Sequence, residues 1–277
     1  MIGLLWKRLR LDGRARIALS IIGLLVAAAL AAPLIARYDP TRIDLVHQFQ
    51  PPSLAHFMGT DVQGRDIWAR VLFGARISLT VGVVSQLIAL AIGVTLGLIA
   101  GYYGRWVDEL IMRLADITLA FPTLLLLIAM AAALQPSLST VYITIGVVGW
   151  AAMARLIRGQ VLVTRQLEFV QAARALGATD RRILARHLLP NVIAPVVIAA
   201  TLGIAGAIMA EAALSFLGLG VQPPTPDWGV MVGNGRLVLY RAAHVATIPG
   251  IVIVVAALAF NFVGDGLREA LDPRARR

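Results

Sequence analysis

Residues 192–217 have the sequence VIAPVVIAATLGIAGAIMAEAALSFL, in which Glu211 is the only charged side chain. A helix needs about 20 predominantly apolar residues to cross the hydrocarbon core of a bilayer, so this stretch predicts a membrane-spanning helix. The rest of the chain fits the same environment, because 59% of its residues are hydrophobic and only 14% are charged. Soluble proteins carry roughly 25% charged residues. The composition therefore indicates an all-α membrane protein with several spans.

Five other apolar runs predict further membrane spans. Together with the stretch above, the expected spans are residues 17–36, 79–101, 111–134, 141–157, 192–217 and 245–264. The first run follows a basic segment, residues 1–16, and its end, ALAAPLIA (residues 29–36), resembles a signal-peptide cleavage site. Because the run is longer than a usual signal core and more spans follow, we interpret it as an uncleaved anchor. Pro122, Pro195 and Pro249 are expected to kink or begin their helices.

The distribution of positive charge predicts which way the chain crosses the membrane. With the amino terminus inside, 18 of the 25 lysine and arginine residues lie on the cytoplasmic side and the rest lie outside. Because these residues are enriched in cytoplasmic loops, both termini are expected in the cytoplasm. The expected organisation is a cytoplasmic segment (1–16), a first span with an outer loop (17–77), a core transmembrane domain (78–264) with a cytoplasmic loop (158–191), and a cytoplasmic tail (265–277).

Charge, cysteine content and motifs exclude several classes of protein. The cytoplasmic bias accounts for the net charge of +10, so no nucleic-acid partner is expected. The absence of cysteine excludes a disulfide framework and a thiolate metal site, and the four histidines form no ligand-type cluster. The sequence has no GxxxxGK[ST], HExxH or GxSxG motif. We therefore expect the chain to be no enzyme itself and to bind no metal or cofactor.

Polar side chains inside the expected spans indicate contacts or functional sites, because each costs a few kcal/mol at membrane depth unless it is paired or hydrated. Glu211 and Ser215 lie in the fifth expected span, and Asn261 lies near the inner end of the sixth. They predict either polar contacts between helices or residues that border a translocation path or its gate. Arg113 and Asp116 are three residues apart and are expected to pair on one helix face.

Small residues recur at every fourth position in the second expected span. They are expected to let a neighbouring helix approach closely, since lipid offers no hydrophobic drive for helix association. The residues of this small-residue face are Ser85, Ala89, Gly93, Gly97 and Gly101.

The cytoplasmic loop contains a polar stretch, EFVQAARALGATDRRILARHLLPN, at residues 168–191. One helical stripe is apolar and small, and it consists of Phe169, Ala172, Ala173 and Leu176. Gly177 is expected to stop this helix in a left-handed conformation. Thr179 or Asp180 is expected to cap a second helix, which Pro190 would end. The pair could lie on the membrane surface, but alanines suit close docking against another protein better than anchoring in lipid.

At these residues the sequence resembles the EAA loop of ABC-importer permeases, whose pattern is E-A-A, three residues, Gly, nine residues and Ile-x-Leu-Pro. Gln171, Ala172 and Ala173 stand at the E-A-A positions, Gly177 at the glycine, and Leu189-Pro190 at the end. Gln171 replaces the usual glutamate, and His187 replaces the isoleucine. The histidine is similar to that of peptide-type permeases.

Three further segments resemble signatures of the dipeptide, oligopeptide and nickel permeases. They are HFMGTDVQGRDIWARVLFGARISL (56–79), AEAALSFLGLGVQPPTPDWG (210–229) and FNFVGDGLREALDPR (260–274). The resemblance covers nearly the whole chain. It is closest to the second of the two permease subunits that such systems encode.

The resemblance implies a type I ABC-importer permease with six transmembrane helices, in the bacterial inner membrane, surrounded by lipid. Its implied partners are a homologous sister permease, two ATPase subunits or domains that hold ATP and Mg²⁺, and a periplasmic or lipid-anchored substrate-binding protein. The loop would act as a coupling helix seated on an ATPase. The residues implied in that coupling are Glu168, Gln171, Ala172, Ala173, Arg174, Gly177, Asp180, Arg181, Arg182, Arg186, Leu189 and Pro190.

The substrate implied first is a di- or oligopeptide, with glutathione-like peptides or nickel as alternatives. An intramembrane enzyme and a stand-alone channel are the rival classes. An intramembrane aspartyl protease would need two aspartates at one depth, whereas Asp39 and Asp265 are expected on opposite sides of the membrane. A channel would not need Gly177 or the alanines of the loop.

Overall fold

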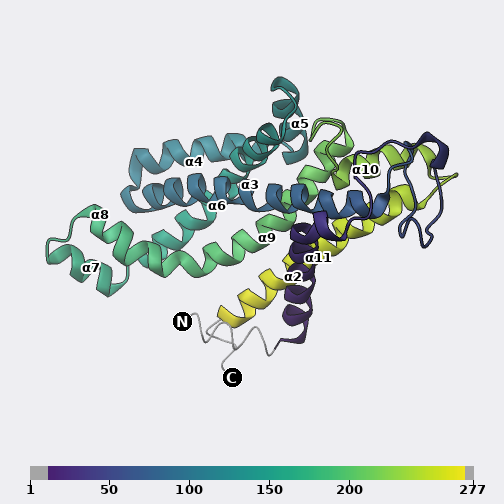
Figure 1. The fold of residues 1–277 in the computed structure, drawn as a ribbon. Helices are drawn as coiled ribbons and strands as arrows, with labels where there is room; N and C mark the ends of the chain where they lie inside the picture. Colours follow the sequence, from purple (N-terminus) through teal and green to yellow (C-terminus); the bar gives the residue numbers. More distant parts are fainter. Residues whose placement is uncertain (1–11, 272–277) are drawn as a thin grey trace.

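The structure is a computed structural model that describes residues 12–271. Lys7, Arg8 and Arg10 of the basic N-terminal segment, and residues 272–277 of the tail, lie outside the described residues. Within the described range the chain is helical and contains no strand, which confirms the all-α prediction. The elements (Figure 1) are α2 (Gly13–Ile35), η1 (Leu45–His47), α3 (Ile67–Tyr103), α4 (Arg105–Ala120), α5 (Thr123–Ala133), α6 (Leu138–Thr164), α7 (Glu168–Ala175), α8 (Asp180–Arg182), the π-helical turn η2 (Ile183–Leu188), α9 (Leu189–Phe216), α10 (Trp228–Gly235), η3 (Arg236–Val238) and α11 (His244–Leu271).

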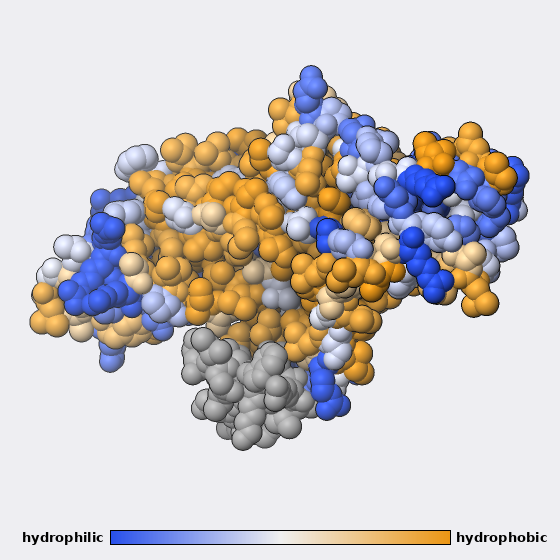
Figure 2. Space-filling model, in the orientation of Figure 1, coloured by the Kyte–Doolittle hydropathy of each residue, from blue (hydrophilic) through white to orange (hydrophobic). Residues whose placement is uncertain are grey.

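Five helices are long and apolar enough to cross a membrane: α2, α3, α6, the continuous run Asp180–Phe216, and α11. The helices α4 and α5 together form a sixth candidate, but they meet at an angle of 92°. Figure 2 shows a broad hydrophobic surface between two hydrophilic ends, one of which covers α7 and α8. This surface fits a bundle that lies in a bilayer.

The third expected span, residues 111–134, is two helices rather than one. α4 ends at Ala120, Phe121 is extended, and α5 begins directly after Pro122. Proline has no backbone N–H, and it disfavours the helical conformation of the residue before it. The prediction that Pro122 begins or kinks a helix is confirmed, whereas Pro195 and Pro249 lie inside α9 and α11.

The small-residue face of α3 packs against α6, and this is the most extensive helix pair in the fold. All five residues of the face are buried. A Cβ atom on Gly93 would lie 2.6 Å from the Cβ of Met153, and one on Gly97 would lie 2.6 Å from the carbonyl oxygen of Ala154. The two backbones are therefore in direct contact, as the spacing of the small residues predicts.

Ion pairs join α4 to α6. Arg158 contacts Asp108 through two hydrogen bonds of 2.5 and 2.6 Å, and Arg155 donates one of 2.5 Å to Asp116. The expected Arg113–Asp116 pair is wrong. Asp116 has its partner on the neighbouring helix, which local spacing cannot reveal, and Arg113 lies 3.4 Å from Glu109 on its own helix.

The other half of the bundle consists of α2, α10, α11 and the outer parts of α3 and α9, which share one hydrophobic core. Trp228, the first residue of α10, is fully buried and donates a hydrogen bond of 3.0 Å to the carbonyl oxygen of Val71. The segment before α3 is held by the buried Asp61, which contacts Arg65 at 2.7 Å and Arg70 at 3.5 Å. Charged side chains are thus internal at this end of the bundle.

Candidate functional site

The loop at residues 168–191 begins as the helix–glycine–helix unit that its sequence predicts. Gly177 has a φ of 80°, in the left-handed region, directly after α7. The N–H of Gly177 donates to the carbonyl of Arg174, and that of Ala178 donates to the carbonyl of Ala173. These two bonds form a Schellman motif, which ends a helix by satisfying its last carbonyl groups. The Thr179 side chain then caps α8 by accepting from the N–H of Arg182 at 3.4 Å.

The prediction that Pro190 ends the second helix is wrong. The helix continues from Asp180 to Phe216, and Pro190 lies in the first turn of α9. Just before it, the N–H of Leu189 donates to the carbonyl of Leu184, five residues back, which is π-helical hydrogen bonding. Proline normally disrupts a helix because it lacks an N–H and its ring clashes with a carbonyl one turn back. The wider π-turn lets the chain pass Pro190 without ending the helix.

The loop packs on the bundle through one set of residues and exposes another. Val170, Ile183 and Leu188 are fully buried in a core that they share with the ends of α3 and α6 and the start of α9. Three residues of the predicted apolar stripe face away from the bundle, since Phe169 and Ala172 are exposed and Leu176 is 88% exposed, whereas the fourth, Ala173, is half-buried. The loop thus presents an apolar surface that its own chain does not cover.

Charged and polar groups surround this exposed stripe. Arg174, Arg181, Arg182 and Arg186 are exposed, and none of them forms an ion pair within residues 12–271. Arg174 lies 5.4 Å from the centre of the Tyr102 ring. Glu168 is exposed in the first turn of α7, where a negative charge suits the helix dipole. Four exposed cationic groups without an ion-pair partner in the described residues therefore suit an external acidic partner, and Arg174 is also held against Tyr102.

Gln171, the departure from the EAA pattern, has a specific contact. Its amide nitrogen donates a hydrogen bond of 2.9 Å to the carbonyl oxygen of Arg165. An ionised glutamate accepts hydrogen bonds and has none to donate, so it could not make this bond. The glutamine thereby ties α7 back to the end of α6.

The candidate path residues Glu211 and Ser215 belong to a buried hydrogen-bonded chain. Ser78 donates to Glu211 at 3.1 Å, and Ser215 lies 2.8 Å from Glu211 and 3.3 Å from Asp227. Asp227 also caps α10 by accepting from the N–H of Val230 at 2.9 Å. The chain connects α3, α9 and α10. Asn261 is half-buried on α11, and no hydrogen bond joins it to this group within the described residues.

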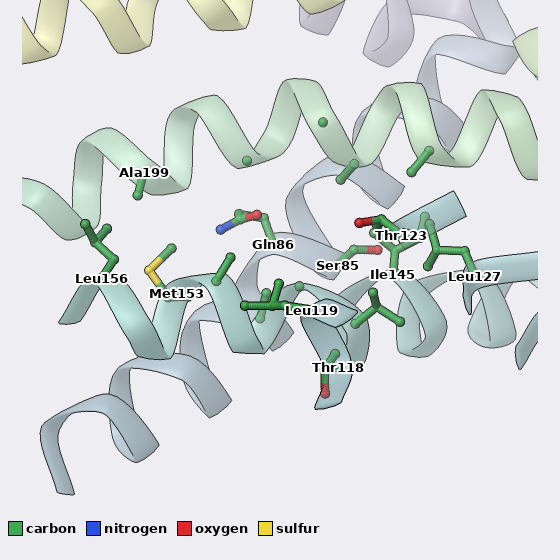
Figure 3. Close-up of a pocket in the computed structure, with 18 residues that line it drawn as sticks. Ser85, Gln86, Thr118, Leu119, Thr123, Leu127, Ile145, Met153, Leu156 and Ala199 are labelled. Atoms are coloured by element: carbon green, nitrogen blue, oxygen red, sulfur yellow. The ribbon is translucent and has the colours of Figure 1, made fainter. Parts of the chain in front are cut away.

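A cavity of about 470 Å³ lies between α3, α4, α5, α6 and α9 (Figure 3). Ser85 and Gln86 line it from α3, Thr118 and Leu119 from the end of α4, and Gly203 from α9. Glu211, Ser215 and Asn261 do not line it. Sequence reasoning missed Gln86, although a signal was present, since it is the only amide side chain in the apolar run 79–101. Polar residues inside a span are functional candidates by default.

Two family models match the chain. The model described as binding-protein-dependent transport system inner membrane component matches residues 93–277. The model described as N-terminal TM domain of oligopeptide transport permease C matches residues 1–52.

Curated relatives agree with the family models, and solved structures share the fold. The chain is 45% identical to the dipeptide transport system permease protein DppC of Alkalihalophilus pseudofirmus, over 98% of this chain and 89% of that protein. It is 43% identical to the glutathione transport system permease protein GsiD of Pectobacterium atrosepticum, over 98% of this chain and 90% of that protein. An inward-facing structure of the MetNI methionine ABC transporter aligns with a TM-score of 0.60 at 20% identity, covering 73% of this chain and 97% of that one. This last likeness supports the fold alone.

Proposed function

Since the chain belongs to the family of binding-protein-dependent transport inner membrane components, as a permease subunit of a peptide ABC importer, we propose that its loop 158–191 couples transport to a separate ATPase. The observation that carries the proposal is the exposed stripe of Phe169, Ala172 and Leu176 beside four unpaired arginines. An apolar stripe inside a hydrophilic end of the molecule suits a protein partner (Figure 2). Arginines suit a partner with an acidic rim.

The remaining partners follow from the same assignment. The chain forms half of a translocation path with a sister permease, and two ATPase subunits or domains bind ATP and Mg²⁺ on the cytoplasmic side. A periplasmic or lipid-anchored binding protein delivers substrate to the outer face. Both termini lie in the cytoplasm, which the excess of positive charge on that side supports.

The loop is packed against the transmembrane helices that are proposed to form the translocation path. Its buried residues share a core with α3, α6 and α9, and α8 continues into α9 without a break. A displacement of the loop therefore acts on three transmembrane helices together. Transport requires a second state that ATP binding favours, because a ligand shifts an equilibrium only through different affinities for the two states.

We assign the outer gate to the buried chain that contains Glu211 and Ser215. This chain joins the outer segment at α10 to α3 and α9, in addition to the Trp228–Val71 bond, so breaking it weakens the attachment of that segment. Asn261 is proposed as a path residue on its membrane depth alone.

Di- or oligopeptides are the proposed substrates, and glutathione-like peptides fit the same architecture. Nickel is the less favoured alternative, because no group of three or more His, Cys, Asp or Glu side chains within residues 12–271 could hold a metal ion. Purifying the assembled importer with its binding protein and identifying the bound ligand by mass spectrometry distinguishes these substrates.

A matched pair of substitutions tests the docking role of the stripe. Ala172→Arg places a large cation on the stripe, whereas Ala175→Arg makes the same change at an equally exposed position of α7 off the stripe. Only Ala172→Arg should lose the copurifying ATPase and ATP-driven transport, with the permease still inserted. If both variants copurify the ATPase and transport like the wild type, the docking role is wrong.

A further inference from the structure

The cavity between α3, α6 and α9 is uncharged. No Asp, Glu, Lys, Arg or His is among the described residues that line it, and most of its wall is aliphatic or glycine. Thr118 satisfies its hydroxyl within α4 by donating to the carbonyl of Leu114 at 2.9 Å. The free hydrogen-bonding groups on the α3 wall are the side chains of Ser85 and Gln86.

Both groups lack partners in the part of the chain that the structure describes. Ser85 is 1% exposed, and no group lies within hydrogen-bonding distance of its Oγ atom. Gln86 is 8% exposed, and its carboxamide makes no hydrogen bond within residues 12–271. Buried polar groups without partners are unfavourable. The Ser85 Oγ atom is sealed between α3 and α6, whereas the Gln86 side chain keeps some exposure and is suited to a ligand that supplies partners.

Gly203 of α9 makes room for the Gln86 side chain. Figure 3 shows Gln86 reaching from α3 toward α9, and a Cβ atom on Gly203 would lie only 2.5 Å from the carboxamide carbon of Gln86. Any larger residue at position 203 would displace the amide group. The packing of α9 thus leaves the carboxamide at the edge of the cavity.

We propose that this cavity binds the peptide-bond portion of the transported substrate, with the Gln86 carboxamide paired to a substrate amide. A carboxamide offers both donors and an acceptor, and so does a peptide group. The volume of about 470 Å³ falls in the usual range for small-ligand sites. Because the lining carries no charge, no side chain of the site forms an ion pair with the substrate, and the specific contact is to the peptide bond. The inference rests on the proposed peptide transport and deepens it.

Substrate protection of a thiol tests occupancy directly, because the chain has no cysteine of its own. Gly206 lines the cavity, and a Cβ atom there would meet nothing within 4 Å, so Gly206→Cys adds a reporter without a clash. Gly159→Cys is the matched control, since it is equally free of neighbours and does not line the cavity. Maleimide labelling is measured in the complete importer, with partner subunits that carry no reactive cysteine.

The probes are dialanine and its ester analogue alanyl-lactate, which replaces the amide N–H by an oxygen. Dialanine delivered by the binding protein should slow labelling at position 206 and leave labelling at position 159 unchanged. Alanyl-lactate should protect position 206 less, because it lacks the amide N–H that donates a hydrogen bond to the side-chain oxygen of Gln86. Equal labelling rates at position 206 with and without dialanine would overturn the inference.

Transport assays of side-chain variants provide a second test of the role of Gln86. Gln86→Leu should lower the transport of neutral, acidic and basic dipeptides by a common factor of about tenfold, which corresponds to about 1.4 kcal/mol. Gln135→Leu, at an exposed position between α5 and α6 outside the cavity, is the control and should transport normally. A Gln86→Leu complex that assembles and transports every peptide at the wild-type rate contradicts the inference.

Failure of the proposed peptide transport can be distinguished from failure of the cavity assignment. A wild-type importer that transports no peptide refutes the proposed peptide transport. An importer that transports peptides without thiol protection and without an effect of Gln86→Leu keeps that function and refutes only the cavity assignment.

Discussion

Tyr102, near the end of α3, donates a hydrogen bond of 2.6 Å to a carboxylate oxygen of Asp180, the first residue of α8. The bond joins the longest helices of the bundle at the loop, since α8 is continuous with α9. With the Gln171–Arg165 bond, it is a direct polar connection between the proposed coupling surface and the transmembrane helices.

Tyr102→Phe should weaken coupling while the loop stays folded. The variant removes one hydrogen bond to a carboxylate, worth about 1 kcal/mol at a site whose acceptor is exposed, and it keeps the ring beside Arg174. The number of peptides transported per ATP hydrolysed should fall in proteoliposomes. Tyr103→Phe is the control, because Tyr103 is adjacent and its hydroxyl makes no hydrogen bond within the described residues. An unchanged ratio in both variants means that the bond does not transmit motion.

Gly177→Ala should strain the loop without a steric clash. Nothing lies within 4 Å of a Cβ atom there, so the cost comes from the left-handed backbone, about 1–2 kcal/mol. Hydrogen exchange over residues 168–182 should become faster, and transport should fall, with Gly177→Pro more severe. Gly159→Ala, inside α6 and equally free of neighbours, should leave exchange in the loop unchanged. Normal transport by Gly177→Pro would show that the turn is dispensable.

Glu211→Gln should impair the proposed outer gate. The amide keeps the size of the side chain but removes a carboxylate from the chain that joins Ser78, Ser215 and Asp227. We expect an assembled complex with reduced transport. Glu211→Ala should also lower thermal stability, by about 1–3 kcal/mol, since it leaves buried hydroxyl groups without an acceptor. Normal transport by Glu211→Gln over the whole pH range in which the complex is stable would reduce Glu211 to a packing role.

Gly97→Ala should destabilise the bundle. The added methyl group would meet the backbone of Ala154, which cannot rotate away as a side chain can. Overpacking of this kind costs about 1–3 kcal/mol, so the complex should unfold at a lower temperature in detergent. Gly23→Ala adds the same group on α2, where nothing lies within 4 Å, and should leave the unfolding temperature unchanged. Equal stability of the two variants would mean that α3 and α6 can move apart freely.

The sequence was sufficient for features that depend on local spacing. Apolar runs located five of the six expected spans, the recurrence of small residues located the α3–α6 contact, and Gly177 located the stop of α7. Each of these depends on residues within a single helix or directly beside it. The Gln171 position was recognisable as a departure from the pattern, but its bond to Arg165 required the turn after α6 to be known.

Features that depend on distant partners were not predictable. Asp116 pairs with Arg155 on another helix, and Trp228 bonds to Val71 across the bundle. Pro190 was misjudged because the rule for proline assumes ordinary α-helical bonding, whereas the preceding π-turn changes which carbonyl faces the ring. The cavity at Gln86 required five helices to be placed together.

The break at Phe121–Pro122 gives the cavity a hinged wall. Thr118 and Leu119 line it from one side of the break, and Thr123 and Leu127 line it from the other. The opposite wall is formed by α3 and α6, which backbone contact holds rigid. A rotation at the break can therefore widen or narrow the cavity while the α3–α6 pair stays intact. Under the proposed assignment of the cavity, such a wall suits a site that takes peptides of different length.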